Sequence, residues 1–187
     1  MTNQKIILVF GLSGVGKSTL IHEFLENRND FIRVSGGSLI DCNKKTEHRD
    51  ELRTLAPCEI LENQKQLIKN FSSIKKELCN KHIVFDGHCI IKNGASITEV
   101  PVDIIKNLFP NIIIFVEGTA EEIIERRKKD STRPNREIET AAQIEEGILL
   151  QKSICSKYSS ELGVPLKVIY ASEIDKFAEI ISDAIST

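Results

Sequence analysis

The sequence predicts an α/β fold in which a five-stranded parallel sheet carries helices on both faces, built as one domain over residues 1–187. Short runs of branched and aromatic apolar residues recur along the chain, and segments with helical periodicity separate them. The first run leads directly into residues 11–18, GLSGVGKS, a full match to the phosphate-binding loop (P-loop) pattern G-x-x-x-x-G-K-[ST]. A strand before this loop and a helix after it are the context that the pattern requires.

The individual elements follow from apolar patterning. Apolar runs rich in β-branched residues predict strands at residues 6–10, 83–85, 112–116 and 166–170, and a weaker pattern predicts a fifth strand near residues 32–34. Helical periodicity predicts helices at residues 18–25, 38–41, 57–80, 102–108, 120–129 and 139–162. Thr119 and Glu122 form a capping-box pattern before one of these helices, and Asn93-Gly94 marks a turn. In the last of these helices we expect an inward face made of Ile144, Ile148, Leu149, Cys155 and Tyr158.

The P-loop residues indicate binding of a nucleoside triphosphate such as ATP. Its glycines let the backbone N–H groups turn inward with no side chain in the way, and the following helix adds its positive dipole end. We expect Lys17 to reach the β- and γ-phosphates and the Ser18 hydroxyl to bind Mg²⁺. The predicted nucleotide-binding residues are Gly11, Ser13, Gly14, Val15, Gly16, Lys17, Ser18 and Thr19.

Further candidates follow the third strand, because ligand sites on parallel sheets lie at the carboxyl ends of the strands. Asp86 ends this strand and is followed by Gly87, so we expect its carboxylate to help Ser18 hold Mg²⁺. His88 has two equal interpretations, a contact to substrate or a histidine paired with the backbone.

An arginine-rich break separates two long helices near the predicted cleft. Arg126, Arg133 and Arg136 surround a segment that contains proline and asparagine, and guanidinium groups placed there can clamp a transferring phosphoryl group. Lys128 and Lys129 are interpreted instead as a solvated helix end.

Composition limits the other functions. A net charge of −2 provides no broad basic field, so binding to bulk nucleic acid is not expected. No apolar stretch is long enough to span a membrane, and the first residues run straight into a strand, so we expect a cytoplasmic protein without a secretion signal. The five cysteines include no C-x-x-C pair and indicate neither a disulfide framework nor a zinc site.

Several stretches, in the order in which they follow one another along the chain, resemble nucleoside monophosphate (NMP) kinases. The resemblance is greatest to the archaeal-type adenylate kinases. Besides the P-loop, these stretches are residues 37–40, 48–55, 86–88, 133–139 and 163–165. The resemblance covers nearly the whole chain. It implies a P-loop NTPase fold of the NMP kinase type, with a short NMP-binding segment at about residues 35–56 and a short arginine-rich lid at about residues 130–138.

The resemblance also implies Mg²⁺-dependent transfer of the ATP γ-phosphoryl group to a nucleoside monophosphate, with AMP as the expected acceptor. The implied catalytic residues are Lys17, Arg126, Arg133 and Arg136, and the implied acceptor-binding residues are Gly37, Ser38, Leu39, Arg53, Asp86 and His88. The chain departs from the family pattern at Lys152, where an arginine is usual, and at 36–38, where an acidic residue is usual.

Two alternatives remain from the residues. The same scaffold serves other small-molecule kinases, including kinases of nucleosides, and it also serves ATP-dependent regulatory or assembly proteins whose closure signals to a partner. The expected ligands are therefore small molecules, and the sequence leaves open whether the protein forms a homo-oligomer.

Overall fold

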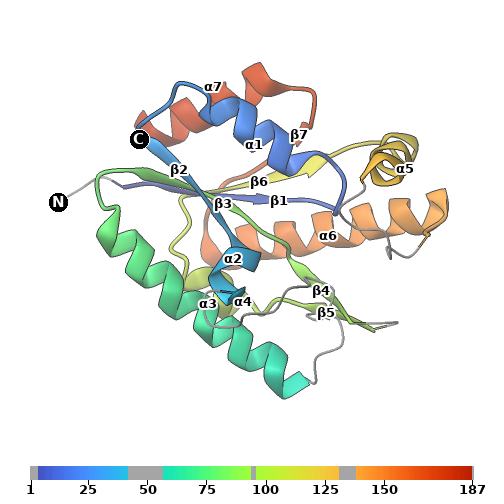
Figure 1. Ribbon diagram of the computed structural model, residues 1–187, viewed down its shortest axis with the longest axis horizontal. Coiled ribbons are helices and arrows are strands. Elements are labelled where there is room, and N and C mark those ends of the chain that lie inside the picture. The colour runs from blue at the N-terminus through green and yellow to red at the C-terminus, as the bar shows by residue number, and fades with distance from the viewer. Residues whose placement is uncertain (1–3, 42–56, 94–95, 131–137, 187) are drawn as a thin grey trace.

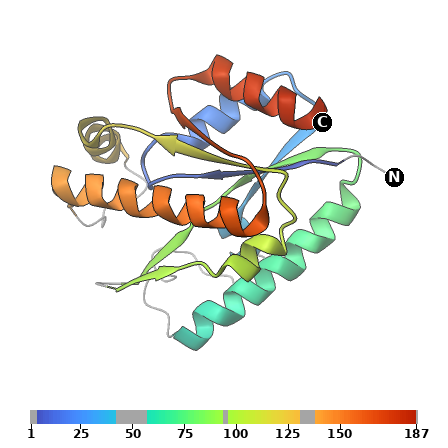
Figure 2. The same ribbon diagram turned by 180° about the vertical axis from the view of Figure 1, so that it is seen from behind.

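The computed structural model describes residues 4–41, 57–93, 96–130 and 138–186. Its main sheet has five parallel strands in the order β2-β3-β1-β6-β7. They are β1 (Ile6–Phe10), β2 (Phe31–Ser35), β3 (His82–Asp86), β6 (Ile112–Glu117) and β7 (Leu166–Tyr170). All five predicted strands are confirmed, and the parallel sheet with helices on both faces is confirmed with them (Figures 1 and 2).

Helices cover both faces of the sheet (Figures 1 and 2). The first face carries α1 (Lys17–Leu25) and α7 (Ile174–Ser186), and α5 (Ala120–Lys129) adds to its core. The other face carries α3 (Pro57–Glu77), α4 (Val102–Lys106) and much of α6 (Ala141–Leu162). The short α2 (Gly36–Asp41) directly follows β2 and lies against α3.

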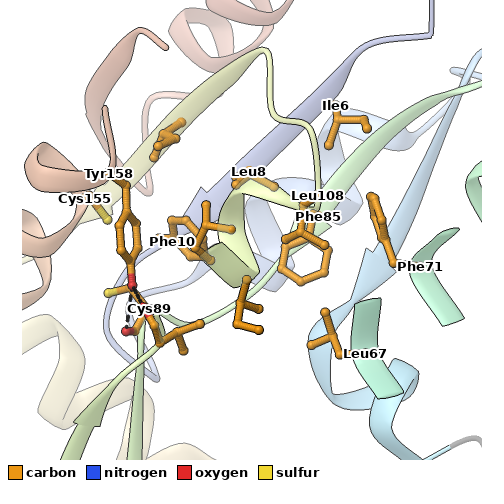
Figure 3. Packing of buried hydrophobic residues seen from close by; sticks show 14 of the residues in the cluster. Ile6, Leu8, Phe10, Leu67, Phe71, Phe85, Cys89, Leu108, Cys155 and Tyr158 are labelled. Atoms are coloured by element: carbon orange, nitrogen blue, oxygen red, sulfur yellow. Dashed lines mark hydrogen bonds between the residues drawn. The ribbon is translucent and has the colours of Figure 1, made fainter. Parts of the chain in front are cut away.

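The strand β1 divides the two cores. All five of its residues are buried, and alternate side chains enter opposite cores, with Ile6, Leu8 and Phe10 on the α3 and α6 side. There Phe10 meets Tyr158 edge-on, with ring centroids 6.3 Å apart (Figure 3). A one-residue shift in register would move every β1 side chain into the opposite core, so the packing of both cores fixes the position of β1 and of the P-loop that follows it.

Three features differ from the sequence prediction, and one of them is the helix α7 (Ile174–Ser186), which the sequence analysis did not assign. Beyond β3 the chain forms an antiparallel pair, β4 (Ile90–Asn93) and β5 (Ser96–Glu99), where the sequence predicted only a turn. The inward face of α6 also differs, because Leu149 is 67% exposed, whereas Gln151 is buried and its carbonyls lie within 3.6–3.8 Å of the Cys89 sulfur. The predicted inward position of Leu149 is therefore wrong.

The predicted helix start is confirmed at α5. The Thr119 hydroxyl accepts from the Glu122 N–H and the Glu122 carboxylate accepts from the Thr119 N–H, which completes the capping box. No helix within the described ranges combines the length and the apolarity needed to cross a bilayer.

Candidate active site

The P-loop leaves β1 through a glycine that no other residue can replace without a clash. Gly11 has a φ of 149°, and a Cβ added there would lie 2.4 Å from the backbone oxygen of Val116 on the neighbouring strand β6. The Val15 N–H then donates to the Leu12 carbonyl at 3.1 Å and closes the turn. Gly16, with a φ of 110°, ends the loop as the N-cap of α1. The loop therefore lies at the carboxyl end of β1, as predicted.

Lys17 is the cationic residue of the P-loop. Its side chain is almost fully buried, and Nζ donates to the carbonyls of Gly11 at 2.7 Å and Leu12 at 3.3 Å. These bonds hold the ammonium against the loop itself. A phosphate oxygen that replaces one of these carbonyls gains a strong charge-assisted hydrogen bond.

Ser18 and Asp86 are in contact at the carboxyl ends of the neighbouring strands β1 and β3. Asp86 ends β3, which pairs with β1, and its Oδ2 accepts from the Ser18 hydroxyl at 2.8 Å. A Cβ on Gly87 would lie 2.4 Å from the Phe85 ring, which explains the glycine after Asp86. Burial raises the pKa of Asp86, but the charge of Lys17 and the hydrogen bonds from Arg33 and Ser18 outweigh it, so the pKa lies below its usual value.

Arg33 completes this cluster, and the sequence analysis missed it. The Arg33 NH2 donates to Asp86 Oδ2 at 2.6 Å and to the Ser18 hydroxyl at 3.0 Å. The available signal was an arginine in the middle of a short apolar strand, β2, next to the strand that ends in Asp86. Since β2 pairs with β3 with Ser35 opposite Asp86, the side chain of Arg33, two residues earlier, needs only to extend along the strand.

The residues around Asp86 fit a magnesium ion. Ser18 and Asp86 supply a hydroxyl and a carboxylate oxygen 2.8 Å apart, and oxygen is the ligand type that Mg²⁺ takes. A guanidinium nitrogen already lies against both oxygens, so both are oriented to bind a cationic partner. Two protein oxygens suffice where nucleotide phosphates and water complete the coordination.

Two consecutive arginines of α5 bind the P-loop from the other side. The Arg126 NH1 donates to the Val15 carbonyl at 2.6 Å, which places this predicted catalytic residue at the loop. The Arg127 Nε donates to the Ser13 carbonyl at 3.0 Å. Arg127 was not predicted. Its side chain is only 9% exposed, so its main role is to hold the loop.

The Arg127 guanidinium also joins an ion-pair network that the sequence did not reveal. Its NH1 donates to one carboxylate oxygen of Glu139 at 2.6 Å, and Lys92 Nζ donates to the other at 2.6 Å. Burial raises the pKa of Glu139, but the hydrogen bonds from Lys92 and Arg127 outweigh it, so the pKa lies below its usual value. The network links α5, β4 and the residues just before α6.

The predicted acceptor-binding residues, and Thr19 of the predicted nucleotide site, differ in how far their side chains are exposed. The Ser38 hydroxyl donates to the Ser35 carbonyl at 2.8 Å, next to Gly37 in the first turn of α2. Leu39 packs into the core and is 1% exposed, so in this conformation its side chain offers no surface to a ligand. His88 is exposed beside the end of β3. Thr19 is exposed on α1.

Three predicted arginines, namely Arg53, Arg133 and Arg136, lie outside the described residues together with most of the predicted NMP-binding segment and lid. Lys152, at the position where an arginine is usual in the family, forms an ion pair with the Glu117 carboxylate at 2.6 Å, at the end of β6.

Known proteins with similar sequences are adenylate kinases. A family model described as "AAA domain" matches residues 10–145. The adenylate kinase of Methanocaldococcus jannaschii is 31% identical over 175 residues, covering 89% of this chain and 89% of the relative. That of Methanothermobacter thermautotrophicus is 30% identical over 171 residues, covering 89% and 90%. That of Methanopyrus kandleri is 27% identical over 187 residues, covering 97% and 96%.

A solved structure supports the fold alone. An unliganded sugar kinase from Janibacter sp. HTCC2649 superimposes with a TM-score of 0.53 over 98% of this chain and 95% of that chain, at 13% identity. The sequence relatives match 89–97% of this chain, and the P-loop, Lys17 and Asp86 lie together at one edge of the sheet. The chain therefore belongs to the adenylate kinase family of P-loop kinases and is a nucleoside monophosphate kinase.

Proposed function

We propose that the enzyme transfers the γ-phosphoryl group of ATP to AMP in a Mg²⁺-dependent reaction. One observation carries the reaction type: Lys17, the Ser18–Asp86 pair and Arg126 converge on the P-loop from α1, β3 and α5. The acceptor is supported by the relatives, which are named adenylate kinases and match nearly the whole chain.

In this reaction a phosphate oxygen of AMP attacks the γ-phosphorus, and the bond from that phosphorus to the β,γ-bridging oxygen breaks. Two molecules of ADP result, and no covalent enzyme intermediate is needed. Since both substrates are anions, the protein mainly aligns them and neutralises charge. Lys17 and Arg126 supply positive charge at the P-loop, and Arg33 adds another beside Asp86.

Magnesium, when bound, would be held by Ser18 and Asp86 and would neutralise the β- and γ-phosphate oxygens. We further propose that Arg53 binds the acceptor phosphate, that Gly37, Ser38 and His88 lie near the acceptor, and that Leu39 contributes to its pocket through packing. Arg133 and Arg136 are proposed to close over the transferred group and to exclude water, since water would otherwise accept the phosphoryl group.

The test is ADP formation from Mg²⁺-ATP by the purified enzyme, with Lys17→Met as background. The acceptors are AMP, dAMP, CMP, UMP, GMP, nucleosides and none. We expect strong stimulation by AMP, with two ADP formed for each ATP consumed. Preference for another monophosphate would change the acceptor but keep the reaction type. Equal ADP formation without an acceptor would contradict the kinase and support a regulatory ATPase.

A further inference from the structure

Arg33 contacts the same two oxygens that the proposed function gives to magnesium. Its NH2 is 2.6 Å from Asp86 Oδ2 and 3.0 Å from the Ser18 hydroxyl. These are direct contacts rather than a long-range attraction, because both distances lie within hydrogen-bonding range. The Asp86 side chain is only 8% exposed, so its carboxylate has little access to water as an alternative partner.

The Arg33 guanidinium and Mg²⁺ cannot both occupy the space beside these two oxygens. Magnesium takes a near-octahedral shell of oxygens and keeps several of them as ordered water. A guanidinium nitrogen that contacts both protein oxygens occupies the space where these waters would stand. An arginine cannot lose its charge at any physiological pH, so the two positive groups also repel each other at this distance.

The Arg33 side chain can move while Ser18 and Asp86 stay in place. It lies on β2, the strand at one edge of the five-stranded sheet, and its side chain is 37% exposed. Asp86 and Ser18, in contrast, are fixed by the end of β3 and the first turn of α1. A long, half-exposed side chain can leave such a pair by rotating about its own bonds, without a change in the fold.

We propose that Arg33 and Mg²⁺ compete for the oxygens of Ser18 and Asp86, so that Arg33 sets how strongly the metal enhances nucleotide binding. With Mg²⁺ present, the arginine is displaced from the two oxygens. With Mg²⁺ withheld, its charge remains beside the nucleotide phosphates and partly substitutes for the metal. This inference rests on the proposed magnesium site.

The measured quantity is the ratio of the Kd for ADP in EDTA to the Kd for ADP with saturating Mg²⁺, obtained by titration calorimetry. Arg33→Met removes the charge but keeps an unbranched side chain. It should raise this ratio about tenfold over wild type, the effect of one charge-assisted hydrogen bond. Arg33→Lys, which keeps a cation, should lie closer to wild type.

Arg28→Met is the matched control. Arg28 lies beyond the end of α1, where its guanidinium stacks over the Phe24 ring at 4.3 Å. This variant also loses one arginine, and it should keep the wild-type ratio. An unchanged or lower ratio in Arg33→Met would overturn the competition. A ratio near one in both wild type and Ser18→Ala would reject the magnesium site itself. Failure of the competition and failure of the proposed magnesium site are therefore distinguishable.

A measurement on the wild-type enzyme covers the case in which Arg33→Met does not fold. The side-chain Nε–H signal of Arg33 in an NMR spectrum can be assigned by its loss in Arg33→Lys. We expect ADP with Mg²⁺ to shift this signal strongly, and ADP in EDTA to leave it close to its position in the unliganded protein. The same shift with and without Mg²⁺ would overturn the proposal.

Discussion

Lys17 lies closer to the core than most lysines, because the P-loop surrounds it. Its ammonium bonds to the carbonyls of Gly11 and Leu12 and is 5% exposed. We expect Lys17→Met to fold, since the new side chain is apolar and of similar length, and to lower kcat about 10²-fold or more through loss of charge stabilisation. Steady-state ADP formation measures this loss.

The matched control is Lys5→Met, at the opposite end of β1, where the backbone N–H of Lys5 donates to His82 Nδ1 and does not depend on the side chain. This variant should keep the wild-type kcat. A Lys17→Met enzyme that retains more than about a tenth of the wild-type kcat would contradict the role given to the ammonium.

Tyr158 shows how one buried hydroxyl joins α6 to the start and the end of the hairpin. It donates to the carbonyl of Val100 and lies 3.4 Å from that of Cys89 (Figure 3). Burial raises the pKa of this phenol, so it remains a donor at all working pH values. Tyr158→Phe leaves a buried carbonyl with a lost partner, and we expect it to lower the free energy of unfolding by about 1–2 kcal/mol.

Urea unfolding followed by circular dichroism measures this change, with Tyr170→Phe as control, because Tyr170 is half exposed. The control should change the free energy of unfolding by less than about 0.5 kcal/mol. Equal stability of Tyr158→Phe and wild type would show that these hydrogen bonds contribute nothing net.

The sequence revealed some residues of the site and concealed others for a physical reason. Lys17 and Asp86 were predicted because a loop pattern and a strand end mark them locally. Arg33 and Arg127 were missed because their roles come from partners 53 and 114 positions away in the chain. No local spacing encodes such a pair, whereas the strand neighbours that create it become known only with the sheet order.

At the level of elements, Glu139 joins three parts of the structure. Its carboxylate accepts from Arg127 on α5 and from Lys92 on β4, and it lies two residues before α6 begins. Since Arg127 also holds the Ser13 carbonyl, a change at Glu139 is transmitted to the P-loop. We therefore expect Glu139→Gln to reduce both stability and ADP affinity.

The pH dependence of stability tests this network. The pKa of Glu139 in the fold lies below 4.5, its usual value, so the unfolded chain takes up a proton first as pH falls. The stabilisation is fully present above about pH 5 and is lost as pH falls through the folded pKa. The difference in unfolding free energy between wild type and Glu139→Gln should be about 2 kcal/mol at pH 7 and should shrink below pH 4.5.

Glu99→Gln is the control for this comparison. Glu99 pairs with Lys157 at 2.8 Å, but both side chains are at least 36% exposed, and exposed ion pairs contribute little. It should differ from wild type by less than about 1 kcal/mol. A difference for Glu139→Gln that stays constant down to pH 3 would show that its ion pairs are not what stabilises the junction.

Most elements with a regular apolar pattern were predicted, although the amphipathic helix α7 was not assigned. The strands β1, β3 and β6, whose residues are nearly all buried, gave clear apolar runs. The hairpin β4–β5 did not, because most of its second strand is exposed. On α6, Leu149 was assigned inward because it is apolar, yet the buried position belongs to Gln151, which meets Cys89. Gln151 lies at helical spacing from Ile144 and Cys155, so the periodicity of the helix is kept and the buried partner explains why a polar residue occupies this position.

At the scale of the whole molecule, the site residues come from both halves of the sequence but meet at the carboxyl ends of β1, β2 and β3 and at α5. Ligand that bridges these elements binds only the folded chain, so it stabilises the fold by mass action. At Mg²⁺-ADP concentrations of 100 times its Kd, we expect about 2.7 kcal/mol of added stability. For a chain of this size, that raises Tm by about 5–10 °C.

Differential scanning calorimetry checks this, with each variant measured alone and with the same Mg²⁺-ADP concentration. Lys17→Met should have a Tm close to wild type without ligand and a much smaller rise with it, because the variant weakens binding and leaves the core intact. Glu139→Gln should have a lower Tm without ligand and a smaller rise as well, since its network both joins elements and supports the P-loop. A full ligand-induced rise in Glu139→Gln would mean that the junction stabilises the fold without shaping the site, and the proposed transmission through Arg127 would then be wrong.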